Sequence, residues 1–427
     1  MNNLEVPTSI DARFFSKGAI ILSFLTLVGV LGYIYRLVYG LDAATNLDNQ
    51  FPWGIWISVD VASGVALAAG GFTTAALADI FHRSKYHSLT RPALLTAMLG
   101  YTFVVVGLLA DLGRYYNVWH PVLPSMWQGN SVLFEVGLCV MIYLTILYVE
   151  FFPIVIEKFL GHVNLPGVLA KYNSLVESFL KISKRTLYRM LSLFIIAGVV
   201  LSCLHQSSLG TLMVIAPYKM HPLWYTPILP LLFLLSAISV GFPMVIFESI
   251  LSSWSFKLKP ETKTLASIAK YTPILLFIYL SVKIGDLAIR NSLGYLAEMN
   301  IQSISFIIEI GIGVIIPMLI LFQRTKRYSI KYLLISASCI IFGILLNRIN
   351  VFLIAYTPPF STGYYFPSFI EIAVTVGLMS GLILIYRFMV IHLPVISMHV
   401  DRRRSDRPGV KSDIVSGPSK SASTKKG

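Results

Sequence analysis

Apolar residues recur in long stretches along nearly the whole chain, and short polar segments separate them. A helix of about 20 apolar residues spans the hydrocarbon core of a bilayer, so each stretch of that length predicts a transmembrane helix. The pattern predicts ten such helices, at residues 18–39, 54–81, 92–115, 131–156, 187–209, 223–253, 265–289, 300–323, 330–349 and 366–391. The first stretch is too long for a signal-peptide core and is followed by no small-residue cleavage site, so we expect it to be retained. The sequence therefore predicts an all-α integral membrane protein.

The composition points to the same class. Of the 427 residues, 56% are hydrophobic and 13% are charged, whereas roughly a quarter of the residues in a soluble protein are charged. A water-soluble enzyme is thereby excluded. Cys139, Cys203 and Cys339 lie in apolar stretches without CxxC spacing, which fits neither a disulfide framework nor a zinc or iron-sulfur motif. We expect no metal site in this chain.

Basic residues lie in alternate polar segments. Of the 34 Lys and Arg residues, 28 fall within residues 13–17, 83–91, 158–189, 257–270, 324–331 and 387–427. The positive-inside rule places these segments, and both termini, in the cytoplasm. The formal net charge of +14 then reflects topology, and we expect no nucleic-acid partner.

Three cytoplasmic segments have distinct patterns. Residues 1–17 form a short N-terminal segment. Residues 392–427 are rich in Ser, Lys and Arg, which predicts a basic, disordered tail; a solvated tail that fixes topology is favoured over one that binds anionic membrane lipid. Residues 165–185 place large apolar side chains at helical spacing with lysines between them, which predicts an amphipathic helix on the cytoplasmic surface.

The outward ends of the predicted helices contain an internal repeat. The matching runs are Asp111-Leu-Gly-Arg114 with Glu135-Val-Gly137, and Asp286-Leu-Ala-Ile-Arg290 with Glu309-Ile-Gly311. Each copy has four helices, an even number, so the repeat predicts two parallel four-helix bundles. We place them at about 52–209 and about 222–349, with flanking helices at 18–39 and 366–391.

An Arg and a Glu recur together at three outward hairpins. The pairs are Arg114 with Glu135, Arg290 with Glu309, and Arg348 with Glu371. An isolated charge in hydrocarbon is costly, so we expect interhelical ion pairs, at least two of them structural.

Functional candidates lie where the first half differs from the second. Asp60, Asp111, Glu135 and His205 are predicted to meet at one depth of the outer leaflet. Acids and a histidine beside an apolar helix surface fit a quinone site, which needs proton exchange and donors to the quinone carbonyls. Each residue also has a structural explanation: Asp111 and Arg114 can neutralise each other, Asp60 can satisfy backbone in a glycine-rich helix, and His205 can be a hydrogen-bonded core histidine.

Further candidates for quinone binding lie nearby. Trp119 and Trp127 are in an aromatic outer loop, where aromatic residues more often anchor a helix at the interface than stack on a ligand. Gln206 adjoins His205. In the second half, Lys283, Asp286 and Glu309 are candidates for a proton path, although a self-compensated structural network is favoured there.

Haem b is the first cofactor to consider in a membrane redox protein. It needs two histidines facing each other within the bilayer. Of the eight histidines, His205 is the one that lies clearly inside a predicted helix. We therefore expect no haem, and expect electrons to come from another subunit.

Five runs of the sequence resemble a known family. They are PWGIWISVDVASGVALAAGG (52–71), LLADLGRYYNVWHP (108–121), NSVLFEVGLCVMIY (130–143), LHQSSLGTL (204–212) and HPLWYTPILPLLFLLSAISVG (221–241). They resemble the NrfD/PsrC-like integral membrane subunits, most closely the HybB type of NiFe hydrogenases, over roughly residues 15–395. Asp111, Arg114, Glu135 and His205 match the outward acidic and histidine positions of that family.

The resemblance implies a haem-free subunit of the bacterial inner membrane. It implies a site for menaquinone or ubiquinone near the periplasmic side, no iron-sulfur cluster in the chain itself, and a docking surface for a periplasmic ferredoxin-like iron-sulfur subunit. The large and small subunits of a NiFe hydrogenase are the favoured source of electrons. A polysulfide, sulfite or cytochrome complex of the same family is an alternative.

Two other classes remain open. Parallel repeats with buried charges also suit a secondary transporter, although matching mid-span Gly or Pro breaks are absent from the two halves. An inert anchor is disfavoured, because anchoring does not require so many acids within the membrane.

Overall fold

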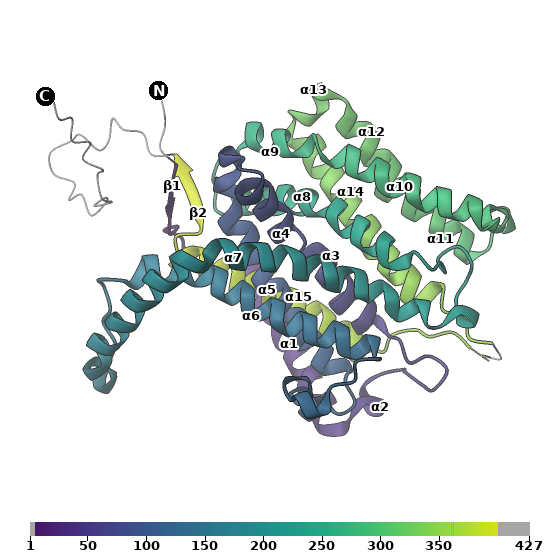
Figure 1. Ribbon diagram of the computed structural model, residues 1–427, viewed down its shortest axis with the longest axis horizontal. Coiled ribbons are helices and arrows are strands. Elements are labelled where there is room, and N and C mark those ends of the chain that lie inside the picture. Colours follow the sequence, from purple (N-terminus) through teal and green to yellow (C-terminus); the bar gives the residue numbers. More distant parts are fainter. Residues whose placement is uncertain (1–4, 360, 362, 400–427) are drawn as a thin grey trace, which may run out of the picture.

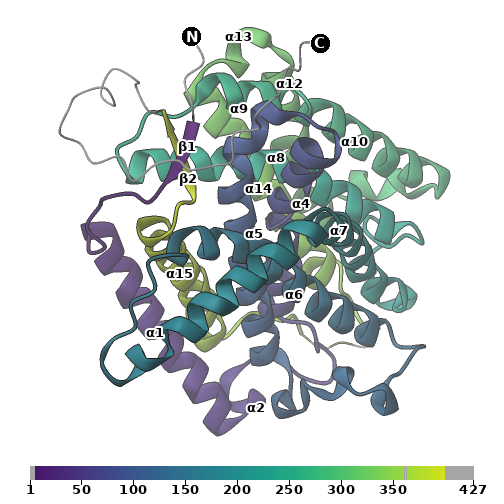
Figure 2. The same ribbon diagram turned by 60° about the vertical axis from the view of Figure 1, so that its left-hand side comes forward.

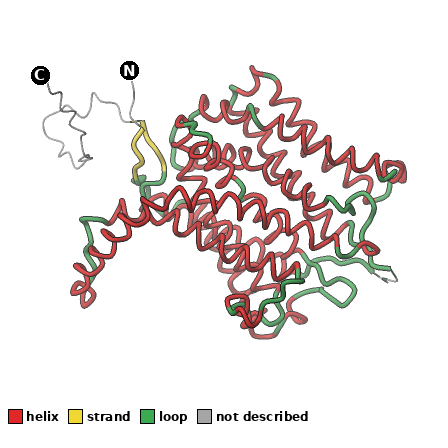
Figure 3. The backbone as a smooth tube through the Cα atoms, in the orientation of Figure 1, coloured by secondary structure: helices red, strands yellow, loops and turns green. Residues whose placement is uncertain are grey.

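A computed structural model of the chain describes residues 5–359, 361 and 363–399. Helices dominate the described chain (Figure 3). Ten helical segments in it are long and apolar enough to cross a membrane: Lys17–Tyr39, Trp56–Ile80, His87–Asp111, Val132–Phe159, Gly167–Val214, Leu229–Ser255, Thr262–Ile289, Ile301–Phe322, Ile330–Ile354 and Phe369–His392. The predicted fold class, an all-α integral membrane protein with ten spans, is confirmed.

The α-helices are α1 (Lys17–Tyr39), α2 (Leu41–Ala44), α3 (Gly64–Leu67), α4 (Gly70–Ala75), α5 (His87–Asp111), α6 (Val132–Phe159), α7 (Asn173–Val214), α8 (Leu229–Ser255), α9 (Thr262–Ala269), α10 (Thr272–Ile289), α11 (Ile301–Ile310), α12 (Ile316–Phe322), α13 (Arg324–Arg327), α14 (Ile330–Ile349) and α15 (Phe369–His392). Four π-helical segments interrupt or extend the spans: η1 (Trp56–Ser63), η2 (Ala76–Ile80), η10 (Gly311–Ile315) and η11 (Asn350–Ile354). Short 3₁₀ turns are η3 (Ser84–Tyr86), η4 (Tyr115–Asn117), η5 (His120–Val122), η6 (Pro124–Met126), η7 (Gly167–Tyr172), η8 (Pro217–Lys219) and η9 (Ser292–Glu298). The two strands are β1 (Glu5–Thr8) and β2 (Ile396–His399).

The spans form two neighbouring groups. The second to fifth spans, from η1 to α7, pack together, and the sixth to ninth, from α8 to η11, pack beside them with α7 against α8 (Figure 1). The first and last spans, α1 and α15, pair with each other and lie against α5 (Figure 2). The candidate sites therefore lie within two helix groups and along the seam where the terminal pair meets α5.

A close glycine contact joins α1 to α15. A Cβ atom placed on Gly377 would lie 2.4 Å from the Cα atom of Gly29. Small residues allow helix backbones to approach closely. Van der Waals packing of this kind drives helix association in lipid, because apolar side chains gain no hydrophobic free energy by moving from lipid into protein. The pairing of the first span with the last thus depends on these two glycines.

The two ends of the described chain meet on one face. Strands β1 and β2 pair antiparallel, with Glu5 opposite His399. The Arg387 guanidinium donates to the backbone oxygens of Phe14, at 2.9 Å, and Arg13, at 2.7 Å. We call the strand pair the terminal clasp. The disordered tail was predicted for residues 392–427, but Ile396–His399 within it is held in this pair. Residues 400–427 of the predicted tail lie outside the described residues.

The fifth span is longer than predicted. The amphipathic segment at 165–185 was expected as a separate surface helix, but it continues into the span as one helix, Asn173–Val214. No Gly or Pro interrupts residues 173–197, and Lys181 lies 3.5 Å from Glu177 one turn earlier, a pairing that favours helix continuity. Its N-terminal part extends away from the helix groups (Figure 1).

We predict that Gly377→Leu destabilises the protein because the larger side chain cannot fit against Gly29. Overpacking of this kind typically costs about 1–3 kcal/mol. The midpoint of thermal unfolding of the detergent-purified protein should fall. Gly285→Leu is the matched control, because a Cβ on Gly285 meets no atom within 4 Å. Equal midpoints for the two variants would contradict this account of the helix pair.

Candidate functional site

Three clusters of polar side chains in the described spans contain candidates that were named from the sequence. The outer cluster contains Asp60, Asp111, Glu371, Arg36 and Thr375. The histidine cluster contains His205, Gln206, Tyr101 and Tyr143. The lysine cluster contains Lys283, Glu309, Asn347, Asn350 and Arg348.

Four elements build the outer cluster, on the side of the molecule opposite the terminal clasp. Asp60 lies on η1, Asp111 ends α5, Glu371 lies in the first turn of α15, and Arg36 lies in the last turn of α1. Thr375 of α15 donates a hydrogen bond to Asp60 Oδ2 at 3.0 Å. The cluster thus joins the second and third spans to the first and last spans.

Glycine at position 107 allows this approach. A Cβ on Gly107 would lie 2.9 Å from the Cβ of Asp60, closer than side-chain carbons pack. The α5 backbone can therefore pass directly beside the aspartate.

Backbone groups hold two of the charges in place. Glu371 accepts hydrogen bonds from the backbone N–H of Ser368, at 2.8 Å, and of Asn46, at 3.1 Å, and from the Tyr365 hydroxyl at 2.5 Å. The Ser368 hydroxyl completes a capping box by accepting from the Glu371 N–H. This carboxylate therefore fixes the start of α15.

Arg36 binds the end of α5. Its guanidinium donates to the backbone oxygens of Ala110 and, at 2.6 Å, Leu112. These carbonyls lie at the negative end of the helix dipole, where a cation is stabilised. Arg36 is fully buried, although sequence analysis did not select it as a candidate.

Asp111 is the least compensated member of the cluster. Its Oδ1 atom is buried and bonded to no described group. It lies within electrostatic reach of Asp60, Glu371 and Arg36. Asp111 thus lies among two other carboxyl groups and one guanidinium in a poorly solvated region, and such a group of acids is suited to holding and exchanging protons.

Two apolar cavities adjoin this cluster. One, of about 230 Å³, has Asp60 as the single charged residue in its lining and includes the lipid-exposed side chains of Met379 and Ile383. The other, of about 430 Å³, lies between α1 and α15. Phe103 and Leu378 line both cavities.

The histidine cluster is tightly packed. His205 is completely buried on α7, and its Nδ1–H donates to the Leu201 backbone oxygen at 2.6 Å. A carbonyl oxygen can only accept, so Nε2 carries no hydrogen and accepts from the Tyr101 hydroxyl. Gln206 donates to the Val65 backbone oxygen at 2.7 Å. In this arrangement neither His205 nitrogen has a free hydrogen, so the predicted donor role stays a prediction and requires the Tyr101 bond to open.

The remaining first-half candidates lie away from the outer cluster. Glu135 is exposed near the start of α6 and accepts from the Ser208 hydroxyl at 2.5 Å. Arg114 is exposed, and none of the ion pairs found in the described chain includes it. Trp119 and Trp127 are each 51% exposed in the outer loop. The predicted meeting of Asp60, Asp111, Glu135 and His205 is therefore divided between separate groups.

The lysine cluster is internally compensated. Lys283 forms an ion pair with Glu309 and donates to the Tyr279 hydroxyl at 3.2 Å. Glu309 also accepts from Asn347, at 2.9 Å, and Asn350, at 2.7 Å. The cavity beside it has only about 10 Å³. The predicted proton path through Lys283, Asp286 and Glu309 stays a prediction; the contacts are those of a structural network.

The predicted Arg–Glu pairs at the three hairpins are wrong for the described residues. Glu309 pairs with Lys283, and Arg290 pairs with Asp286 on its own helix at 2.7 Å. Arg348 lies over the Phe233 ring, 3.7 Å from its centroid, and donates to Ser236 at 2.9 Å. Sequence spacing did not identify the partners, because Asp286 lies one turn from Arg290 on the same helix and Lys283 lies nearer to Glu309 than Arg290 does.

Comparisons with known proteins agree with the fold. Residues 43–359 match the profile of the family described as "Polysulphide reductase, NrfD". A protein of Nitratidesulfovibrio vulgaris is 37% identical over 395 residues, covering 90% of this chain and 96% of that one. The "Probable Ni/Fe-hydrogenase 2 b-type cytochrome subunit" of Escherichia coli is 32% identical over 394 residues, covering 91% and 95%. The "Menaquinone reductase, integral membrane subunit" of Nitratidesulfovibrio vulgaris is 28% identical over 221 residues, covering 49% and 48%.

The words "b-type cytochrome" in one relative's name raise the question of haem. Axial ligation by histidine would need a second imidazole facing His205 across the bundle. Both His205 nitrogens are already bonded within the protein. The other histidines with described side chains lie in loops or at helix ends: His82, His87, His120, His162, His221 and His392. These residues do not fit a haem held by two histidines within the membrane.

We predict that Lys283→Met destabilises the protein strongly because it leaves Glu309 as an uncompensated buried charge. Loss of one member of a buried pair typically costs about 3–5 kcal/mol. Thermal unfolding of the purified protein should show a clear fall for the single variant. The double variant Lys283→Met with Glu309→Gln should regain much of that loss. If the double variant is less stable than the single one, the pair does not act as a unit.

Proposed function

This chain belongs to the NrfD polysulphide reductase family, and on that basis we propose that it is a quinone-reacting membrane subunit of a respiratory oxidoreductase complex. Electrons would come from an iron-sulfur subunit on the outer face and pass to a quinone dissolved in the membrane. Reduction of the quinone to a quinol takes two electrons and two protons. The chain must therefore supply a lipid-accessible pocket and groups that transfer protons.

The observation that carries the proposal is the position of Asp60. Its carboxyl group is the single charge among the residues lining the cavity of about 230 Å³, and that cavity includes lipid-exposed side chains of α15. A quinone head at Asp60 would leave its isoprenoid tail along apolar residues toward lipid. This is the combination expected of a quinone site, an apolar cavity with a few polar groups that fix orientation.

The outer cluster would provide the protons. Asp60 and Asp111 interact electrostatically, and Asp111 is also within reach of Glu371 and Arg36. A proton delivered to a quinone oxygen from Asp60 can be replaced from Asp111. Thr375 positions the Asp60 carboxyl through its hydrogen bond, while Arg36 offsets part of the negative charge.

The histidine cluster is a second location for the quinone head. There, Asp111 or Glu135 would handle protons and His205 would donate to a quinone carbonyl, with Arg114, Trp119, Trp127 and Gln206 as further contacts. The complete burial of His205 and its bonds to Tyr101 and Leu201 favour Asp60 instead. Variants in the two locations distinguish them.

Orientation and partners follow from charge. The Arg91 guanidinium donates to the Pro394 backbone oxygen at 2.9 Å, and Lys85 bonds Ser267, so several basic segments lie on the face of the terminal clasp. We propose that this face is cytoplasmic in the bacterial inner membrane, with both termini inside. The outer cluster then lies toward the periplasm, within reach of a ferredoxin-like iron-sulfur subunit. The hydrogenase name of one relative supports NiFe hydrogenase large and small subunits as the source of electrons, and menaquinone, named for another, as the acceptor, with ubiquinone the alternative.

We predict that Asp60→Asn lowers quinone-linked turnover by about 100-fold or more, the lower end of what a positioned acid or base contributes. The measurement is quinone reduction by the purified complex, beside reduction of an artificial dye by its catalytic subunits. Dye reduction should be unchanged. Asp42→Asn is the matched control, because Asp42 is an exposed acid following α1.

Two results would contradict the placement. Full quinone activity in assembled Asp60→Asn and Asp111→Asn, with loss in Glu135→Gln and His205→Gln, would move the head to the histidine cluster. Full quinone activity in all four variants would contradict a quinone site at either location. The secondary transporter would then be the remaining function class.

We further propose that the chain carries no haem, since the histidines offer no facing pair. The purified chain should give no stoichiometric b-type absorbance in a pyridine haemochrome assay. One haem b retained per chain after removal of its partners would overturn this.

A further inference from the structure

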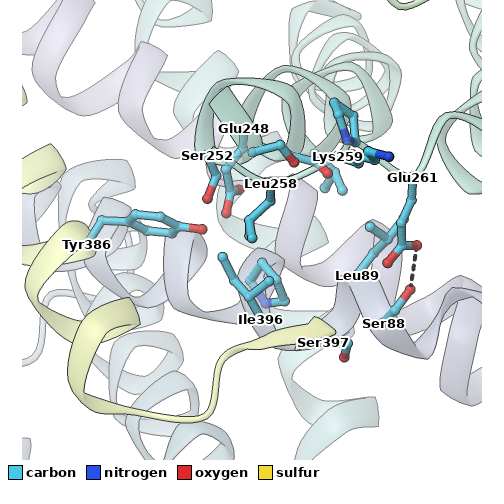
Figure 4. Close-up of a pocket in the computed structure, with 15 residues that line it drawn as sticks. Ser88, Leu89, Glu248, Ser252, Leu258, Lys259, Glu261, Tyr386, Ile396 and Ser397 are labelled. Carbon is cyan, nitrogen blue, oxygen red and sulfur yellow. Dashed lines mark hydrogen bonds between the residues drawn. The ribbon is translucent and has the colours of Figure 1, made fainter. Parts of the chain in front are cut away.

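A cavity of about 450 Å³, lined by both polar and apolar residues, opens on the face of the terminal clasp, far from the outer cluster. Helices α5, α8 and α15 and strand β2 surround it. Figure 4 shows the Tyr386 hydroxyl pointing toward Glu248 and Ser252, with Ile396 and Ser397 of the clasp on the opposite side. None of these residues was selected by sequence analysis, and the quinone mechanism uses none of them.

Glu248 lies among buried hydroxyl groups. Both of its carboxylate oxygens are buried, and so are the hydroxyl oxygens of Thr96, Ser252 and Tyr386. Thr96 and Tyr386 approach the carboxyl group, and Ser252 approaches Tyr386. Hydroxyl groups can donate to a carboxylate but carry no positive charge, so burial disfavours the charged form of Glu248 and favours binding of a proton.

The chemistry of the site favours a proton over a metal ion. One carboxylate and three hydroxyl groups provide too little charge for a divalent cation, and the described residues contain no group of three His, Cys, Asp or Glu side chains that could hold one. The other titratable side chains that line the cavity are Lys259, Glu261 and Tyr386. Glu261 accepts from the Ser88 hydroxyl at 3.2 Å, and no ion pair found in the described chain includes Glu248.

The cavity has space for several water molecules, each of about 30 Å³ in the liquid. Water in it could carry protons between the clasp face and the buried carboxyl group. We propose that Glu248 is a proton-binding site that exchanges with the cytoplasm through this cavity, with Thr96 and Tyr386 as its hydrogen-bonding partners and Ser252 beside Tyr386. A water molecule or hydronium ion gives H⁺ to the carboxylate, and the carboxyl group returns it by the reverse step.

Glu248 and Asp60 lie near opposite ends of helix α5, along which α15 packs. Thr96 lines both the apolar cavity of Asp60 and the surroundings of Glu248. Gly107, which packs against Asp60, is eleven residues further along α5, or about 16 Å at 1.5 Å per residue. Gly100, Phe103 and Val104 line the interval. An apolar section therefore separates the two acids, and Glu248 exchanges protons with one side of the membrane only.

Labelling with dicyclohexylcarbodiimide tests the proposal, because this reagent modifies protonated carboxyl groups in apolar surroundings. The wild-type complex in native membranes is treated over a range of pH, and the modified peptides are identified by mass spectrometry. Glu248 should be labelled, and its labelling should fall about tenfold for each pH unit above its titration midpoint. Tyr386→Phe should move that midpoint, and Glu261→Gln should leave the Glu248 adduct in place.

Two outcomes of this experiment overturn the proposal. Glu248 that remains unlabelled at every pH holds no exchangeable proton. Protection of Glu248 when sodium replaces potassium at fixed pH would show that the cavity binds sodium instead. Either result leaves the proposed quinone function untouched, since that rests on Asp60.

Access from the cytoplasm is tested separately with a thiol introduced into the cavity. Ser252→Cys should react with a membrane-impermeant methanethiosulfonate reagent at least tenfold faster in inside-out vesicles than in right-side-out vesicles. Ser239→Cys, fully buried on the same helix, is the control and should not react in either. Equal protection of both cysteines in both kinds of vesicle would show that the cavity is closed to water.

Discussion

A charge placed in hydrocarbon must find compensation inside the protein, and this constraint organises the structure. Water is not available at that depth, so carboxylate, guanidinium and ammonium groups bind one another or backbone groups of neighbouring helices. Arg36 joins α1 to the end of α5, Glu371 joins α15 to the segment before η1, and Lys283 joins α10 to α11. The first two contacts connect segments that lie far apart in the sequence, and the third connects two consecutive spans.

Compensation is complete around one buried acid and incomplete around others. Around Glu309, amide, indole and ammonium groups satisfy both carboxylate oxygens, and little space is left. Around Asp111, by contrast, a buried oxygen lacks a partner, and cavities lie beside Asp60 and Glu248, which have no basic partner among the ion pairs of the described chain. A satisfied network holds helices together. An acid beside a cavity, without a basic partner, is available for proton transfer. The two cavities with such acids, at Asp60 and at Glu248, lie toward opposite faces of the molecule.

The hydrophobic pattern predicted ten spans because span length and hydropathy are properties of local sequence. The partners of buried charges were not predictable in this way. Tyr101 occupies an ordinary apolar stretch, yet its hydroxyl bonds Nε2 of His205, while the Leu201 backbone oxygen fixes the tautomer. Glu248 also lies among apolar residues, and its importance becomes apparent only when Thr96 and Tyr386 arrive from two other helices. The Ser368-x-x-Glu371 capping box is the exception, since its four-residue spacing could have been recognised from sequence.

The contact between Gly29 and Gly377 also affects how the chain is made. A ribosome releases α1 long before α15, so the first helix must reside in the membrane without its partner while more than 300 residues follow. Contacts between distant segments form late and leave surfaces exposed meanwhile. During that interval α1 also carries Arg36, which is buried in the finished protein. The backbone oxygens that Arg36 binds, at the end of α5, are synthesised before α15. We therefore expect the contacts to form in order of synthesis. The Arg36 guanidinium binds the end of α5 first, and Gly29 packs against Gly377 when the last helix inserts.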